Sequence, residues 1–302
     1  MHPVLVRVPL PFGHHFTLYS YGFLIGCGFL LALYVCRKRA VRMGLDPDGL
    51  VDVALATLVG GLVGARLFYI LTYWDNFRGN LWEILRIDHG GLVFYGGLMG
   101  GAALLFTTVL WKGMPVRRTL DTLTSVVPLG HAFGRLGCFM NGCCFGKPTG
   151  SWVGVRFPSP PGLSIDPATP NPYATPVHPT QLYAVGYNLL IFAFLSFIYS
   201  KRRRNGDVAW SYGILYGTAR FCQEFFRGDV PHVFAGLTMA QLICIPLVGL
   251  GATMMVRSLR LSREPLPEPW KPRETKEAAA GARAPEPAPE PSGRRNRRKR
   301  HR

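Results

Sequence analysis

Three arginines stand within long apolar segments of the chain, where a charged side chain is hard to accommodate. Arg66, Arg135 and Arg220 interrupt segments that are otherwise mostly apolar. An arginine at the centre of a membrane-crossing helix is disfavoured by at least ~2.5–3.5 kcal/mol, so such a residue indicates a functional site. Glu224 follows Arg220 by four residues, shares its helix face and can pair with it. Two alternatives stay open: a purely structural ion pair, and arginines that reach the membrane interface from a span end.

Arg66 and Arg135 have no obvious acidic partner in the sequence. An anionic ligand would satisfy both, and a guanidinium is suited to bidentate binding of a phosphate. The abundant anion in a membrane is the phospholipid headgroup. The arginines therefore predict a site for an anionic lipid.

Further polar residues gather in three segments close to these arginines: GGLVFYGGLMGG (90–101), GHAFGRLGCFMNGCCFG (130–146) and VHPTQLY (177–183). In the first, glycines flank Tyr95 and would let a substrate approach the backbone. The small-xxx-small spacing of Gly97 and Gly101 is also typical of close helix packing, and we favour that interpretation for these two glycines. In the third, His178 stands just before a helix start.

Cys138, Cys143 and Cys144 form an irregular trio. Zinc sites usually combine two C-x₂₋₄-C pairs, a pattern that this trio does not make. We therefore expect no metal site. A disulfide on the oxidising outer face is an alternative for one pair, but small buried residues are the preferred interpretation.

The composition indicates which elements position these residues. Hydrophobic residues make up 48% of the 302 residues and charged residues only 17%, against about 25% in ordinary soluble domains. This excludes an ordinary soluble enzyme and a disordered protein. Apolar segments of the ~20 residues needed to cross a bilayer recur seven times. We predict an all-α polytopic membrane protein with seven spans, near 18–36, 50–73, 91–111, 119–137, 180–200, 208–226 and 236–256.

Basic residues lie in clusters that follow the odd-numbered spans: Arg37 to Arg42, Lys112 to Arg118, Lys201 to Arg204 and Arg257 to Arg263. Short loops rich in Lys and Arg stay in the cytoplasm. The pattern predicts an external N-terminus and a cytoplasmic C-terminus.

The net charge of +17 is explained partly by the C-terminal segment. Residues 264–302 are Pro-rich and then strongly basic, which predicts a disordered cytoplasmic tail after a membrane domain of residues 1–263. Anchoring at the anionic inner leaflet explains such a tail more simply than nucleic-acid binding. We expect no nucleic-acid partner.

Six segments together resemble the prolipoprotein diacylglyceryl transferases of bacterial inner membranes. The family signature Gly-Arg-x-Gly-Asn-Phe-x-Asn-Gly-Glu-x-x-Gly corresponds to GRLGCFMNGCCFG (134–146). The other landmarks occur in the family's order: YSYGFLIG (19–26), GGLVFYGG (90–97), HPTQLY (178–183), RFCQEFFR (220–227) and TMAQ (238–241). The resemblance covers residues 15–257 and leaves the tail outside.

The resemblance implies transfer of a diacylglyceryl group from phosphatidylglycerol to the lipobox cysteine thiol of a prolipoprotein. A thioether forms, glycerol phosphate is released, and no cofactor is implied. Cleavage of the carbon–oxygen bond requires stabilisation of the leaving phosphate, which the arginines would supply. The expected catalytic residues are Tyr95, Arg220, Glu224 and Tyr21, and the expected substrate-binding residues are Arg135, Asn141, Gly146, Arg66, His178 and Gln181.

The chain departs from the family pattern at three positions. Tyr95 replaces the family's histidine, Cys138 its asparagine and Cys143 its glutamate. A histidine would suit a general base because it titrates near neutrality, whereas tyrosine has a reference pKa of about 10. Tyr95 assisted by arginines, His178, or a reaction that depends less on a base are the alternatives.

Other function classes stay open at this point. The same fold can bind phosphatidylglycerol but use another acceptor, or transport an anionic solute, although no internal repeat supports a transporter. A non-catalytic module that binds acidic lipid through its tail is a further alternative. Deletion of residues 264–302 separates them, since an embedded site keeps its activity and a tail-dependent module loses it.

Overall fold

The computed structural model describes residues 3–9, 15–86, 90–158, 173, 175–201, 204–228, 230–260 and 267–270. The chain divides into two units, Met1–Trp270 and Lys271–Arg302, and the second lies outside the described residues. Of the tail predicted for 264–302, residues 267–270 are described in the first unit, where the Trp270 N–H donates to the carbonyl oxygen of Val41, at 2.8 Å; the rest stays a prediction.

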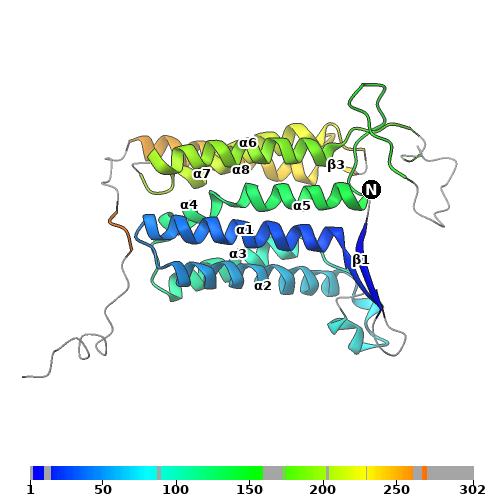
Figure 1. Cartoon of the computed structure of the whole chain (residues 1–302), viewed down its shortest axis with the longest axis horizontal. Coiled ribbons are helices and arrows are strands. Elements are labelled where there is room, and N and C mark those ends of the chain that lie inside the picture. Colours follow the sequence, from blue (N-terminus) through cyan, green and yellow to red (C-terminus); the bar gives the residue numbers. More distant parts are fainter. Residues whose placement is uncertain are drawn as a thin grey trace, which may run out of the picture. The chain divides into compact units, whose positions relative to one another are not determined.

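Helices make up most of the first unit (Figure 1). They are α1 Ser20–Arg42, α2 Pro47–Thr72, α3 Phe94–Trp111, α4 Val116–Thr124, α5 Val127–Asn141, α6 Thr180–Lys201, α7 Asp207–Glu224 and α8 Met239–Leu259, with the 3₁₀ segments η2 Trp74–Asn76 and η3 Leu81–Leu85. Two antiparallel strand pairs complete the described part: β1 Val4–Pro9 with β2 His15–Tyr19, and β3 His232–Phe234 with β4 Leu237–Thr238.

Five described helices are long and apolar enough to cross a membrane: α1, α2, α3, α6 and α8. They coincide with five of the seven predicted spans. The prediction of one continuous span over 119–137 is wrong, because the chain forms two helices there, α4 and the 15-residue α5. At ~1.5 Å per residue α5 is shorter than the ~30 Å hydrocarbon core. The predicted span 208–226 forms the 18-residue helix α7. Its polar residues make it less apolar than the five helices named above, so it is not one of them.

A buried carboxylate explains why α4 is polar. Asp121 is fully buried and accepts hydrogen bonds from the backbone N–H groups of Gly206 (2.8 Å) and Ala209 (2.9 Å). These donors belong to the first turn of α7, which has no intrahelical partners for them and favours a negative charge. Asp121 thereby fixes the start of α7, the helix that carries Arg220 and Glu224.

The helices lie side by side with roughly parallel axes (Figure 1). The loop between α1 and α2 lies at the same end as α4 and the start of α7. Strands β1 and β2 and the described parts of the α5–α6 connection lie at the opposite end. Helix α5 contacts both α1 and α6, so its side chains reach the interior of the bundle.

Helices α2 and α3 approach each other closely through glycines. A Cβ atom at Gly64 would collide with the backbone oxygen of Gly96, and one at Gly100 with that of Gly60. The expected small-residue packing of Gly97 and Gly101 is present, since both face the α2 backbone. The tightest contact is nevertheless made by Gly96 and Gly100, one position earlier on the helix.

Candidate functional site

The Arg220–Glu224 ion pair is the most buried charge pair of the described chain. The two side chains contact each other on α7 and are 12% and 0% exposed. The pairing expected from their spacing is confirmed. Neither carboxylate oxygen of Glu224 has a further hydrogen-bond partner among the described residues. A buried pair with unused polar atoms can still accept a ligand.

Arg135 lies on α5 and is half-buried. Its Nε donates a hydrogen bond to Nε2 of His131, at 3.2 Å, one turn earlier on the helix. Its Nη groups donate no hydrogen bond within the part of the chain that the structure describes. Arg135 therefore keeps the two-pronged face of its guanidinium available for an anion.

Aromatic and polar side chains connect the two arginines. The His131 ring lies 5.5 Å from the ring of Tyr216, which in turn lies 6.5 Å from that of Tyr187. The Tyr187 hydroxyl donates to Oε1 of Gln223, at 2.9 Å. Tyr216 lies within electrostatic range of both Arg135 and Arg220. The two guanidinium groups thus face one shared, partly aromatic interior.

Two tyrosines flank this interior. Tyr21, in the first turn of α1, lies within electrostatic range of Arg135 and of the three clustered cysteines. Tyr95, in the first turn of α3, lies within range of Arg220 and Glu224. The structure therefore brings the expected residues Tyr21, Arg135, Tyr95 and the ion pair into one region.

The α5–α6 connection is held against the start of α6. Gln181 is fully buried and its Nε2 donates to the carbonyl oxygen of Cys143, at 2.6 Å. The backbone N–H of Gly146 donates to the carbonyl oxygen of His178, at 2.8 Å. A Cβ at Gly146 would lie 2.5 Å from the backbone oxygen of Phe226, so only glycine fits. Gln181 and Gly146 act on the loop backbone.

His178 and Asn141 stand at the edge of the site. The Nδ1 atom of His178 shares a hydrogen bond of 3.0 Å with the Tyr183 hydroxyl, and its ring contacts that of Phe226. Asn141 is exposed at the end of α5 and its side chain reaches Cys143. Neither residue contacts the ion pair in the described structure.

Arg66 differs from the sequence-based expectation. It is 7% exposed, and its guanidinium donates to five backbone carbonyl oxygens. These belong to Glu83, Ile84, Arg86, Gly90 and Gly91, at 2.5–3.2 Å. Contrary to the prediction from the sequence, Arg66 needs no anionic ligand, because backbone carbonyl oxygens already satisfy its charge. Arg66 ties η3 and the entry to α3 to the end of α2.

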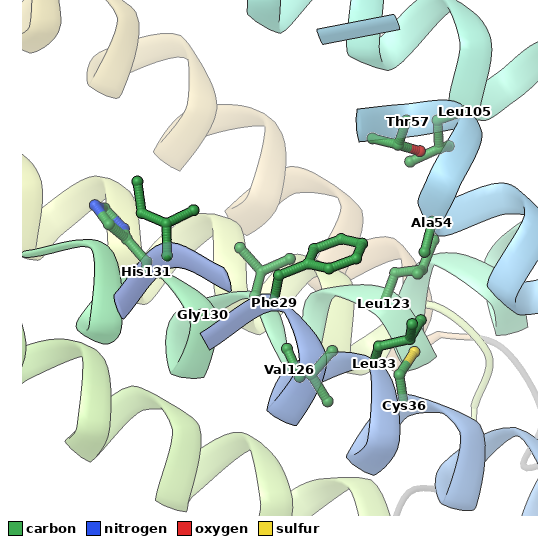
Figure 2. A pocket seen from close by; sticks show the side chains of 13 residues that line it. Phe29, Leu33, Cys36, Ala54, Thr57, Leu105, Leu123, Val126, Gly130 and His131 are labelled. Atoms are coloured by element: carbon green, nitrogen blue, oxygen red, sulfur yellow. The ribbon is translucent and has the colours of Figure 1, made fainter. Parts of the chain in front are cut away.

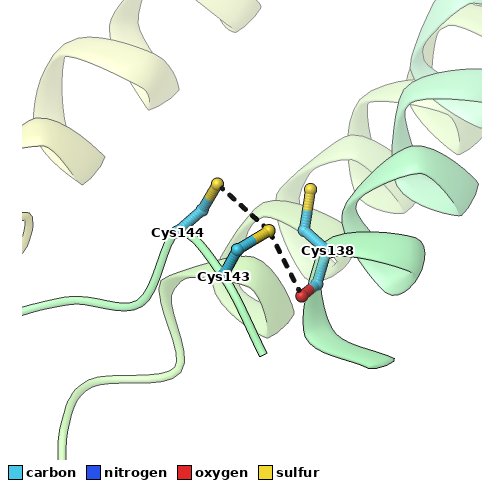
Figure 3. A group of neighbouring side chains, drawn as sticks. All are labelled: Cys138, Cys143 and Cys144. Carbon is cyan, nitrogen blue, oxygen red and sulfur yellow. Dashed lines mark hydrogen bonds between the residues drawn. The ribbon is translucent and has the colours of Figure 1, made fainter. Parts of the chain in front are cut away.

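The three cysteines meet at the end of α5. All three sulfur atoms lie within 4.8 Å of one another, and those of Cys143 and Cys144 are 3.6 Å apart. Figure 3 shows the Cys143 sulfur directed towards the other two side chains. Each cysteine is partly buried, and none forms a disulfide.

An apolar cavity of about 350 Å³ lies on the other side of His131. Its walls come from α1, α2, α3, α4 and α5 (Figure 2). Phe29, Leu33 and Leu123 line it, and His131 stands at one end. His131, which lines one end of the cavity, is also the hydrogen-bond partner of Arg135.

Several site residues were missed by the sequence interpretation. Gln223 directly precedes Glu224 on α7, and its Nε2 donates to the carbonyl oxygen of Thr180, at 2.7 Å. A glutamine within a mostly apolar segment could have indicated that Gln223 belongs to the site. Tyr187 and Tyr216 carried no such signal, because tyrosine is common in membrane helices.

The comparisons with known proteins cover the same part of the chain. A family model described as prolipoprotein diacylglyceryl transferase matches residues 7–257. The phosphatidylglycerol–prolipoprotein diacylglyceryl transferase of Clostridium tetani is 34% identical over 251 residues, 83% of this chain and 95% of the relative. That of Thermotoga petrophila is 35% identical over 253 residues, 83% and 84% of the two chains. All of the site residues lie within the matched range.

Replacement of Arg66 should loosen a defined segment. Arg66→Ala leaves five carbonyl groups without their donor, so backbone hydrogen exchange should become faster in residues 81–86 and 90–93. Exposed Arg78, which pairs only with Asp75 on the surface among the described residues, provides the control as Arg78→Ala. Equal exchange in both variants and the unaltered chain would contradict the role assigned to Arg66.

Proposed function

This chain belongs to the prolipoprotein diacylglyceryl transferase family, and we propose that Arg135 and Arg220 bind the phosphate of its lipid substrate between them. The enzyme is a transferase that moves the diacylglyceryl group of phosphatidylglycerol to a prolipoprotein. The observation that carries the assignment of the site is Arg135, a half-buried arginine whose Nη groups are free of described partners and face the same interior as Arg220.

The reaction proceeds by attack of the lipobox cysteine sulfur on the glycerol carbon that is esterified to phosphate. The thiol proton passes to water, the carbon–sulfur bond forms, the carbon–oxygen bond breaks, and the electron pair leaves with glycerol phosphate. Negative charge gathers on the departing phosphate. Preorganised guanidinium groups stabilise that charge strongly where water is excluded.

The remaining residues assist in distinct ways. Glu224 holds Arg220 in position, since its buried carboxylate is the counter-charge one turn along α7. Tyr95 lies beside this pair and Tyr21 beside Arg135, so each can hydrogen-bond the headgroup or the acceptor. Asn141 and His178 stand at the rim, where a prolipoprotein enters.

Three residues act through the backbone. Gln181 and Gly146 shape the α5–α6 loop, and Arg66 positions the entry to α3 and thereby Tyr95. The contacts already described support these assignments. None of the three needs to touch the lipid.

The apolar cavity suits an acyl chain of the lipid. Its volume of about 350 Å³ is that of a small-molecule pocket, its walls are mostly apolar, and His131, the partner of Arg135, stands at one end. A headgroup bound at Arg135 would place an attached chain at this opening.

We also propose that the chain crosses a bacterial inner membrane seven times, with α4 and α5 together forming one of the two less apolar crossings, α7 forming the other, and the N-terminus outside. Five apolar helices and the basic loops support this topology. A membrane-impermeant maleimide should label Trp152→Cys in intact cells but label Arg117→Cys only after permeabilisation, relative to the unaltered chain. The reverse pattern would overturn the orientation.

Arg135→Ala should lower diacylglyceryl transfer by about 10²–10³-fold, the usual effect of removing one donor to a developing oxyanion. Arg135→Lys should be intermediate, since it keeps the charge and loses the bidentate fork. The assay measures the mass of a lipobox peptide after incubation with phosphatidylglycerol.

The matched control for that assay is Arg37→Ala, which removes an exposed arginine paired with Asp48 at 2.8 Å and should transfer at the normal rate. A folded Arg135→Ala enzyme with near-normal turnover would eliminate the phosphate-binding role.

A further inference from the structure

The three cysteines at the end of α5 have the geometry of metal ligands. Zinc–sulfur bonds of ~2.3 Å in a tetrahedron place ligand sulfurs ~3.8 Å apart. The Cys143 and Cys144 sulfurs are 3.6 Å apart, and all three lie within 4.8 Å of one another. Small side-chain rotations would close this arrangement on one ion. A disulfide would use only two of the three sulfurs.

The backbone around the cluster is built to direct these sulfurs inward. Helix α5 ends at Gly142, whose φ of +74° turns the chain back, and the Cys143 N–H donates to the Cys138 carbonyl, at 3.2 Å. Cys144 adopts a left-handed φ of +65°, a conformation unfavourable for a non-glycine residue and common at functional sites. The Thr180 hydroxyl donates to the Cys144 carbonyl, at 2.7 Å.

The cluster supplies three metal ligands rather than four. Within the described ranges, the only group of three or more converging His, Cys, Asp or Glu side chains consists of these thiols. Structural zinc sites have four protein ligands, whereas catalytic sites have three and keep one position open. Soft thiolate ligands select zinc or copper(I). The cluster therefore matches an open zinc site.

The location of the cluster matches the chemistry of the acceptor. It lies beside Tyr21, which is within electrostatic range of all three thiols and of Arg135. A sulfur nucleophile held there would stand next to the guanidinium that receives the leaving phosphate. Cys138 and Cys143 also occupy two positions of the signature motif, in a chain that carries Tyr95 where a histidine was expected.

Resting on the transferase activity proposed above, we propose that Cys138, Cys143 and Cys144 bind a zinc ion whose open position receives the acceptor thiol of the prolipoprotein. On binding, the acceptor thiol releases its proton to water, because a thiol that coordinates zinc is deprotonated. The zinc-bound sulfur then attacks the glycerol carbon, the carbon–oxygen bond breaks and glycerol phosphate leaves with the electron pair. No electron is gained or lost, and no separate general base is required.

Metal analysis of the purified full-length enzyme tests the site. We expect about one zinc per chain, the stoichiometry of a single three-thiolate site, and its loss in Cys143→Ser. The matched control is Cys27→Ser, which removes a partly buried thiol of α1 and should retain the zinc. A metal-free protein in which alkylation and mass analysis find a disulfide within the trio, or three free thiols, would overturn the proposal.

The open position is tested by replacing zinc with cobalt(II) in the unaltered chain. Thiolate-to-cobalt charge-transfer absorption should appear, and the ligand-field bands should shift when a lipobox peptide is added. A peptide with serine in place of the cysteine should cause no shift. Identical shifts with both peptides, or none with either, would contradict thiol coordination.

Chelation separates this proposal from the transferase activity itself. Removal of zinc should reduce transfer by about 10²–10⁴-fold, the range associated with loss of a general base, and added zinc should restore it. Transfer that is unaffected in a zinc-free enzyme would refute the zinc site and leave the activity standing. An enzyme that binds zinc, and whose cobalt form shows the peptide-dependent shift, but that transfers nothing would refute the activity and leave the site.

Discussion

The placement of charge inside an apolar bundle is the constraint on which this structure depends. An isolated guanidinium or carboxylate in such surroundings is strongly disfavoured, so each must be paired, or face a ligand. Arg220 and Glu224 meet this constraint together on α7. Arg66 meets it with carbonyl oxygens. Arg135 meets it only in part, through His131, so its guanidinium keeps donors for a ligand.

The same constraint explains the less regular helices. Asp121, on the short and polar α4, is buried and accepts hydrogen bonds from the backbone at the start of α7. The break between α4 and α5 in turn lets α5 lie between α1 and α6. Residues that look unsuitable for a membrane helix therefore hold the two arginine-bearing helices in place.

The long helices and the Arg220–Glu224 pair could be predicted from the sequence, because they depend on local residue patterns. Apolar runs indicated the five long helices, and four-residue spacing indicated the Arg220–Glu224 pair. The break near residue 125 could not be predicted, since Asp121 finds its donors more than 80 residues later. The partners of Arg66 are backbone carbonyls, which carry no sequence signature. The convergence of the cysteines depends on the Gly142 turn and on the anchoring of the loop by Gln181 and Thr180.

Diacylglyceryl transfer by this chain is tested most directly by a reconstituted reaction with the whole chain. Purified enzyme, vesicles of phosphatidylglycerol and a synthetic lipobox peptide would be incubated together, and the peptide analysed by mass spectrometry. We expect a peptide that gains one diacylglyceryl group on its cysteine, with release of glycerol phosphate. An unmodified peptide, in parallel with a Thermotoga petrophila relative that modifies it under the same conditions, would show that this chain does not catalyse the transfer.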